Sequence, residues 1–125
     1  MNNNRRIGAQ KETLAADYLK QRGLVILERN FRNRTGEIDI IARDRPGILV
    51  FIEVKYRRST RCGRADEAVG PSKQRVIRQT AAYYLYIHHI PEEHPVRFDV
   101  IAIQEETNPQ TGEKKESIRW IRDAF

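Results

Sequence analysis

Apolar residues recur at helical spacing in two segments of the chain. The stripe positions are Leu14, Ala15, Tyr18 and Leu19 in the first segment and Ile77, Ala81, Tyr84 and Leu85 in the second. A spacing of three or four residues places such positions on one helical face, so we predict helices over 9–22 and 71–87. Gly23 is a typical C-terminal stop, and Pro71 suits a first helical turn. Residues 1–8 are mostly polar and are expected to be flexible.

Between and after the helices, the apolar positions follow strand spacing. Alternation over 37–43 places Ile38, Ile40 and Ala42 on one face and Asp39 and Ile41 on the other. The run 48–52 is apolar throughout, which indicates that the strand 48–56 is buried on both faces at its start. A turn with Pro and Gly at 44–47 makes these two strands an antiparallel hairpin. Shorter strands are predicted over 24–27, 96–103 and 117–121, with a polar turn at 107–115.

The predicted elements follow the order α-β-β-β-α-β-β, which describes an α/β protein with a mixed sheet flanked by helices. The chain contains no internal repeat, low-complexity tract or linker, and 125 residues suit one domain spanning 1–125. Hydrophobic residues make up 39% and charged residues 32%, which is typical of a globular rather than a disordered chain.

Charge and cysteine content narrow the kind of partner and compartment. Lys plus Arg number 23 against 17 Asp plus Glu, a net charge of +6, and a basic chain favours polyanions such as nucleic acid. Many basic proteins bind no specific polyanion, so the net charge alone favours a nucleic-acid partner only modestly. Cys62 is the single cysteine, which excludes an intramolecular disulfide. Since no apolar run reaches bilayer length and no apolar leader follows the start, we expect a cytoplasmic protein without a membrane partner.

The two hairpin strands carry the candidate chemistry. Glu53 and Lys55 are two residues apart, so their side chains leave the same face of the second strand. Asp39 lies between two isoleucines of the first strand, and the hairpin brings it near Glu53. Buried charges are unfavourable unless they are paired or bind a metal. Mg²⁺ or Mn²⁺ prefers carboxylate oxygens, and an adjacent lysine suits phosphodiester hydrolysis.

The alternative is a solvated, charged rim at the strand end, with Asp39 as an ordinary polar position. Glu-x-Lys is a common tripeptide, and on its own it would favour that alternative. The apolar run, the hairpin and the spacing of Asp39 together favour a reactive centre of Asp39, Glu53 and Lys55.

Two longer blocks resemble a known family. Residues 36–42 read GEIDIIA and residues 50–55 read VFIEVK, and both blocks resemble the YraN-like family of bacterial proteins. The resemblance runs from Glu12 to about Ile103 and includes Arg29-Asn30-x-Arg32, Lys73 and Arg97-Phe98-Asp99-Val100. That family is similar to Holliday junction resolvases, so the resemblance implies the restriction-endonuclease-like, PD-(D/E)xK fold.

The resemblance also implies a metal site and a catalytic lysine. Asp39 and Glu53 would be metal ligands, with the backbone carbonyl of Val54 as a third, and Lys55 would be the catalytic lysine. Ile38 stands where the motif name expects proline, which is normal for YraN-like proteins. The family implies no demonstrated activity. By analogy with resolvases, which cut a four-way junction symmetrically, it implies a homodimer.

Two further residues have a functional and a structural interpretation of about equal weight. Glu12 matches an acidic residue that joins the metal site in resolvase-like relatives, and Mg²⁺ ligation is its functional role. Its structural role would be a carboxylate that the helix macrodipole favours near an N-terminus. Lys73 would reach a substrate phosphate, or would extend from the helix end into solvent.

Arginines flank the presumed site on both sides. They are Arg32 and Arg34 before it and Arg57, Arg58, Arg61 and Arg64 after it. Such side chains contact phosphates without reading sequence, and a solvated basic loop is the alternative. Two functions therefore stand: a Mg²⁺- or Mn²⁺-dependent endonuclease acting on DNA, with branched and damaged DNA as candidate substrates, and a non-catalytic nucleic-acid-binding module on a nuclease fold.

Overall fold

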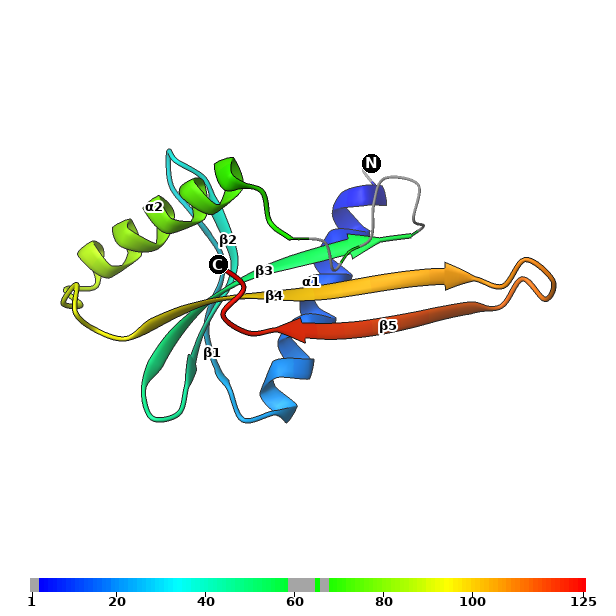
Figure 1. Ribbon diagram of the computed structural model, residues 1–125, viewed down its shortest axis with the longest axis horizontal. Helices are drawn as coiled ribbons and strands as arrows, with labels where there is room; N and C mark the ends of the chain where they lie inside the picture. The colour runs from blue at the N-terminus through cyan, green and yellow to red at the C-terminus, as the bar shows by residue number, and fades with distance from the viewer. Residues whose placement is uncertain (1–2, 59–64, 66–67) are drawn as a thin grey trace.

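Five strands form one mixed sheet, and the two helices cover its opposite faces (Figure 1). The computed structural model describes residues 3–58, 65 and 68–125. In chain order the elements are α1 (Asn3–Gln21), β1 (Val25–Arg32), β2 (Glu37–Asp44), β3 (Ile48–Arg57), α2 (Pro71–Ile87), β4 (Val96–Thr107) and β5 (Lys114–Ile121). The predicted α/β class and the predicted order of elements are confirmed. Within the described ranges, neither helix has the length and apolarity needed to span a bilayer.

The strands lie in the sheet in the same order as in the chain. Neighbouring strands are antiparallel except β3 and β4, which pair in parallel from Leu49↔Val96 to Arg57↔Gln104. Parallel neighbours need a crossover connection, which here contains α2. β3 is therefore the central strand and is hydrogen-bonded on both sides, which accounts for its continuous apolar run.

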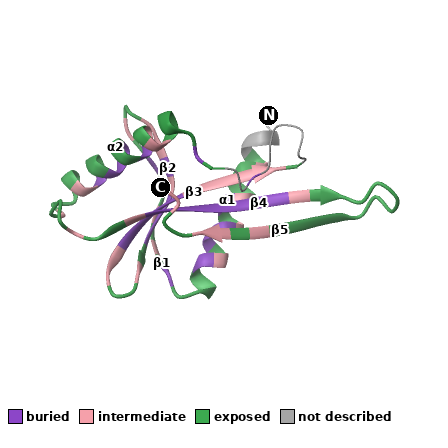
Figure 2. Cartoon of the chain, in the orientation of Figure 1, coloured by how far each residue is buried: buried purple, intermediate pink, exposed green. Residues whose placement is uncertain are grey.

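Each face of the sheet carries its own apolar cluster. Figure 2 shows the long buried stretch of β4. On the α2 side, Phe51 and Phe98 stack with ring centroids 5.6 Å apart, and Tyr84 of α2 meets Phe51 edge-on. On the α1 side, Ile52 packs in a cluster with Leu19 of α1. Consecutive residues of β3 thus belong to opposite clusters, as the apolar run predicts. Both faces of this strand are fixed just before its candidate catalytic residues begin.

Near the β1–β2 turn, the alternation of side chains between the two sides of the sheet is interrupted in both β1 and β2. The alternation predicts Ile38 and Ile40 on one face, and this is wrong: Ile38 packs on the α2 side and Ile40 on the α1 side. Their partners on β1 are Phe31 and Arg29, and Phe31 packs with Ile38 on the α2 side. Between these partners lies Asn30, with a φ of 57°. This left-handed residue interrupts the two-residue repeat of β1, and the paired strand β2 follows.

Several boundaries differ from the predictions because backbone pairing extends strands beyond their apolar pattern. The helix α1 begins at Asn3 instead of residue 9, and β1 continues from the predicted 24–27 to Arg32. The polar turn predicted at 107–115 is shorter, since the β4–β5 ladder continues to Thr107↔Lys114. β3 stops pairing at Gln104 of β4. Residues 105–116, here called the ribbon, therefore form a two-stranded hairpin that projects from the sheet (Figure 1).

A buried carboxylate anchors the end of the chain to β4. Asp99 is fully buried and accepts hydrogen bonds from Arg97 Nε (2.9 Å), Trp120 Nε1 (2.9 Å) and the backbone N–H of Asp123 (2.9 Å). Arg97 also donates to Asp44 at 3.0 Å. Strands β2, β4 and β5 and the end of the chain are thus linked through one charge network, which the strand alternation alone does not predict.

Candidate active site

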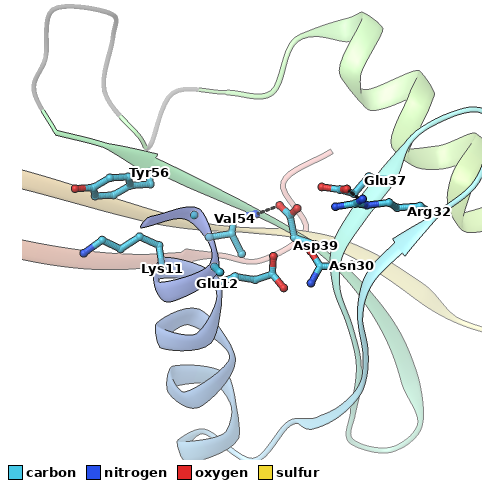
Figure 3. Close-up of a pocket in the computed structure, with 10 residues that line it drawn as sticks. Lys11, Glu12, Asn30, Arg32, Glu37, Asp39, Val54 and Tyr56 are labelled. Atoms are coloured by element: carbon cyan, nitrogen blue, oxygen red, sulfur yellow. Dashed lines mark hydrogen bonds and ion pairs between the residues drawn. The ribbon is translucent and has the colours of Figure 1, made fainter. Parts of the chain in front are cut away.

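Asp39 occupies the point at which β2 and β3 separate. Pairing between these strands runs from Asp44↔Ile48 only as far as Ile40↔Ile52. One residue beyond that last pair, Asp39 Oδ2 accepts a hydrogen bond of 2.8 Å from the backbone N–H of Val54, shown as a dashed line in Figure 3. The carboxylate thus accepts the hydrogen bond that the Val54 N–H would otherwise donate to a backbone carbonyl of β2.

Burial makes the charge of Asp39 unfavourable. Desolvation, with a further contribution from the carboxylate of Glu53, raises the pKa of Asp39 from 3.8 to about 7, although the Val54 hydrogen bond opposes the rise. The carboxylates of Glu12 and Glu37 add smaller contributions in the same direction. Four acidic residues therefore act on one another here, and a cation bound at Asp39 would relieve the excess negative charge.

Glu53 and Lys55 lie on the α2 side of β3, where they line a cavity of about 290 Å³ together with Lys73. Lys73 Nζ lies 3.6 Å from Glu53 Oε1, and the Glu53 side chain is 15% exposed. Burial raises the pKa of Glu53, and the ammonium groups of Lys73 and Lys55 oppose that rise. The predicted same-face placement of Glu53 and Lys55 is confirmed, and Lys73 reaches the site from the first turn of α2.

A larger cavity, about 600 Å³, lies on the α1 side of β3. Its polar lining, most of it labelled in Figure 3, includes Lys11, Glu12, Asn30, Glu37, Asp39 and Tyr56. Val54 and Tyr56 line both cavities, so the two cavities meet along the end of β3. Asp39 lines the α1-side cavity and Glu53 the α2-side cavity. The candidate reactive centre is therefore approached from both faces of the sheet.

Glu12 lines the same cavity as Asp39. It is buried, and its Oε1 accepts a hydrogen bond of 3.1 Å from Arg29 Nε. Arg29 also donates to Thr13 Oγ1 at 3.0 Å, so two consecutive residues of α1 hold the guanidinium. Because α1 begins at Asn3, Glu12 lies in the middle of the helix, where the macrodipole explanation does not apply.

The predicted phosphate-binding arginines are distributed around the site unequally. Arg32 lines the α1-side cavity and pairs with Glu37, and Arg57 lines the α2-side cavity. Arg34 in the β1–β2 turn and Arg58 after β3 are exposed. The predicted residues Arg61 and Arg64 lie outside the described residues.

The donor set is compatible with a hard divalent cation that keeps part of its water shell. Within residues 3–58, 65 and 68–125, no three His, Cys, Asp or Glu side chains group closely enough to hold a metal alone. Mg²⁺ needs only one or two carboxylates, and Asp39 and Glu53 supply two that interact electrostatically. Since N–H and C=O of one strand residue face the same neighbour, the Val54 carbonyl faces the gap that Asp39 occupies. Asp39 and Val54 thus meet where β2 leaves β3, and Glu53, the preceding residue of β3, lines the cavity on the α2 side.

Three residues at the site were not identified as functional from the strand and helix patterns. Asn30 is exposed and left-handed, Tyr56 is half-buried, and Glu37 is ion-paired. Of these, Asn30 and Glu37 lie in blocks that carried the family resemblance, and Tyr56 does not. Neither hydrophobic spacing nor a chemical motif marks Tyr56 or Glu37, because their roles depend on which elements meet in space.

Comparison with known proteins identifies relatives over most of the chain. A family model described as "Uncharacterised protein family UPF0102" matches residues 11–103. A UPF0102 protein of Lachnoclostridium phytofermentans is 48% identical over 118 residues, which cover 94% of this chain and 91% of the relative. A UPF0102 protein of Nitrosococcus oceani is 44% identical over 94% of this chain and 90% of the relative. A UPF0102 protein of Thermodesulfovibrio yellowstonii is 46% identical over 79% of this chain and 86% of the relative.

Proposed function

On the premise that the chain belongs to the uncharacterised protein family UPF0102, we propose that it is a Mg²⁺- or Mn²⁺-dependent endonuclease that hydrolyses DNA phosphodiester bonds. The proposal includes a restriction-endonuclease-like core. The sheet order, the parallel β3–β4 pair with its α2 crossover, and the separation of β2 from β3 at Asp39 support this fold. Branched and damaged DNA are the proposed substrates.

The raised pKa of Asp39, about 7, is the observation that carries the proposal. A structural carboxylate is normally paired so that its pKa falls, as the pKa of Asp44 does beside Arg97. Asp39 is instead held by one backbone N–H beside the second carboxylate of Glu53. A carboxylate in a cavity whose pKa is strongly perturbed by burial and by a specific charged neighbour is a candidate functional group.

The side chains have distinct roles in the proposed hydrolysis. Asp39, Glu53 and the Val54 carbonyl would hold the cation, which supplies a Lewis acid that polarises the phosphate and increases the acidity of nearby water. Lys55 lies on the same face as Glu53, where it would orient the attacking water and stabilise charge on the phosphate. Lys73 would contact a phosphate oxygen once the cation replaces it as the partner of Glu53.

A nuclease assay with matched variants tests the proposal. Linear, flapped and four-way DNA are incubated with Mg²⁺ or Mn²⁺ and either the parent protein, Glu53→Gln or Lys55→Met. Cleavage is expected only with metal, and each variant is expected to lose at least about 100-fold, the effect typical of one catalytic group. Glu93→Gln and Lys20→Met, the same changes at exposed positions, are expected to retain parent activity.

A non-catalytic nucleic-acid-binding module is the second candidate function. It is favoured by the Lys73–Glu53 ion pair, which neutralises one carboxylate without a metal. In that case DNA binding persists in EDTA, no condition gives cleavage, and Glu53→Gln leaves affinity unchanged. This result would refute the endonuclease proposal, whereas metal-dependent cleavage lost in both active-site variants would refute the module.

A further inference from the structure

The α1-side cavity is about twice as large as the α2-side cavity, at about 600 Å³ against about 290 Å³. The proposed hydrolysis uses Asp39 and Val54 from its lining. The remaining polar groups, above all Tyr56 at one end and Asn30 at the other, have no part in that chemistry (Figure 3). Their arrangement therefore calls for a ligand adjacent to the reacting phosphate.

Tyr56 presents a fixed aromatic ring to this cavity. Its hydroxyl donates a hydrogen bond of 2.8 Å to Glu105 at the base of the ribbon. Lys11 Nζ lies over the ring, 4.9 Å from its centroid, and is ion-paired with Glu116. The ring is thus anchored at its hydroxyl and has a cation over one face. An aromatic ring with an adjacent cation is the usual platform for an unpaired base and its phosphate.

Asn30 supplies a polar group to the same cavity. Its φ of 57° is a left-handed conformation inside a strand, a kind of local strain that concentrates at functional sites. The residue lies between the pairs Arg29↔Ile40 and Phe31↔Ile38, which places it opposite Asp39. Its side chain makes no hydrogen bond to the residues that the structure describes. The amide therefore offers both a donor and an acceptor to a ligand.

The acidic residues of the cavity wall do not exclude an anionic ligand. Glu12 is paired with Arg29 and Glu37 with Arg32, so each of these carboxylates has a basic partner. Asp39 is the acidic residue of this lining for which the structure shows no basic partner among the described residues. A cation at Asp39 would make the cavity suitable for a nucleotide phosphate.

We propose that the α1-side cavity is a subsite for an unpaired nucleotide, with its base against Tyr56 and its polar edge within reach of Asn30. This proposal rests on the proposed function, since the nucleotide adjoins the phosphate at Asp39. While a base is stacked inside a duplex, it cannot enter this cavity, which lies beside the end of β3 where the phosphate would be cleaved. The substrate class is therefore nucleic acid with an unpaired nucleotide at the cut, such as a flap or fork, and intact duplex is a poor substrate.

Binding measured without metal tests the subsite separately from catalysis. A duplex carrying a short single-stranded flap, with 2-aminopurine as the first unpaired base, is titrated with protein in EDTA. Stacking on Tyr56 is expected to quench the fluorescence, and the flap is expected to bind on the order of 10-fold more tightly than the same duplex without it. An RNA flap of the same sequence determines whether the sugar matters.

Matched variants separate the ring and the amide from general stability. Tyr56→Phe keeps the ring and is expected to retain the flap preference, whereas Tyr56→Leu is expected to lose both the preference and the quenching. Asn30→Gly keeps the left-handed backbone without the amide and is expected to weaken flap binding but not duplex binding. Tyr86→Leu removes an aromatic ring that is 78% exposed on α2 and is expected to behave as the parent.

The outcomes distinguish this proposal from the proposed endonuclease function. Preference for the flap that Tyr56→Leu abolishes supports the subsite even if no metal gives cleavage. Equal binding of flap and duplex, or a preference that persists in both Tyr56→Leu and Asn30→Gly, would overturn the subsite even if duplex DNA is cleaved. Circular dichroism of each variant confirms that loss of binding does not arise from unfolding.

Discussion

Replacing Asp39 by asparagine should make the metal-free protein more stable, and increasingly so as the pH rises. The folded-state pKa of Asp39, about 7, lies above its ordinary value of 3.8. The folded chain therefore holds this proton more tightly than the unfolded chain, and stability falls as the pH rises from 3.8 to about 7. Asparagine carries no charge and can still accept the hydrogen bond from Val54.

The magnitude follows from the two pKa values. Each pH unit between them corresponds to about 1.4 kcal/mol, so the penalty grows to about 4 kcal/mol above pH 7. At pH 5 less than half of it is present, since the pH exceeds the lower value by little more than one unit. Asp39→Asn should therefore gain a few kcal/mol on the parent between pH 5 and pH 8.

Urea unfolding in EDTA at pH 5 and pH 8 measures this gain. Comparing the two pH values cancels any constant effect of the amide on packing. Asp44→Asn is the matched control, because burial raises the pKa of Asp44 but hydrogen bonds from Arg97 and the backbone lower it overall. A depressed pKa gives stability that is present above 3.8 and is lost only as the pH falls below it. Asp44→Asn should thus be destabilising by the same amount at both pH values.

A difference between Asp39→Asn and the parent that stays constant from pH 5 to pH 8 would refute the reasoning. It would mean that Asp39 is already ionised at pH 5, so that the folded chain compensates its charge. The carboxylate would then have no excess charge for a divalent cation to relieve. Equal m-values for parent and variant are required for the comparison to be valid.

Three further changes test the scaffold around the site. Asp99→Asn should destabilise by about 3–5 kcal/mol in urea unfolding followed by circular dichroism, because it removes the fully buried partner of Arg97, which then keeps only Asp44. Gly36→Ala should lower stability by about 1–3 kcal/mol in thermal unfolding, since the added Cβ would overlap Val76 of α2. Asn30→Val should lower stability by about 1–3 kcal/mol, because a β-branched side chain disfavours its φ of 57°; urea unfolding measures the loss.

Each of these changes has a matched control. Asp17→Asn alters an exposed carboxylate and should be neutral, so an equal loss there would contradict the role of the buried network. Gly8→Ala adds a Cβ with no atom within 4 Å and should stabilise α1 by up to about 1 kcal/mol. For Asn30, glycine should be tolerated, and equal losses for glycine and valine would show that the backbone conformation is not the cause.

The order of the elements and the position of Glu53 and Lys55 on β3 were predictable from the sequence because short-range patterns encode them. Alternation and apolar runs locate β3, and a spacing of two places Glu53 and Lys55 on one face. The reversal at Ile38 was not predictable, since it depends on the left-handed Asn30 of the neighbouring strand. The role of Tyr56 was equally unpredictable, because its hydrogen-bond partner, Glu105, is 49 residues away in the chain.

The separation of the two cavities on either side of β3 also depends on tertiary structure. Spacing alone suggested that Asp39 and Glu53 belong to one site, and their electrostatic interaction agrees with this. It did not indicate that their side chains line different cavities, because that follows from where β2 leaves β3. Alternation describes residues within one strand and does not reveal where neighbouring strands part.

The ribbon beyond Gln104 has a dynamic consequence. Its backbone hydrogen bonds join only β4 and β5 and cover no apolar cluster, so this segment belongs to the low-stability end of the molecule, where local opening occurs without global unfolding. Glu105 and Glu116 lie opposite each other in the backbone ladder at its base. The side chain of Glu105 accepts the hydrogen bond from Tyr56, and that of Glu116 is ion-paired with Lys11. Fraying of the ribbon to its base therefore releases the aromatic ring and the ammonium together, and hydrogen exchange in residues 105–116 would report the mobility of one wall of the α1-side cavity.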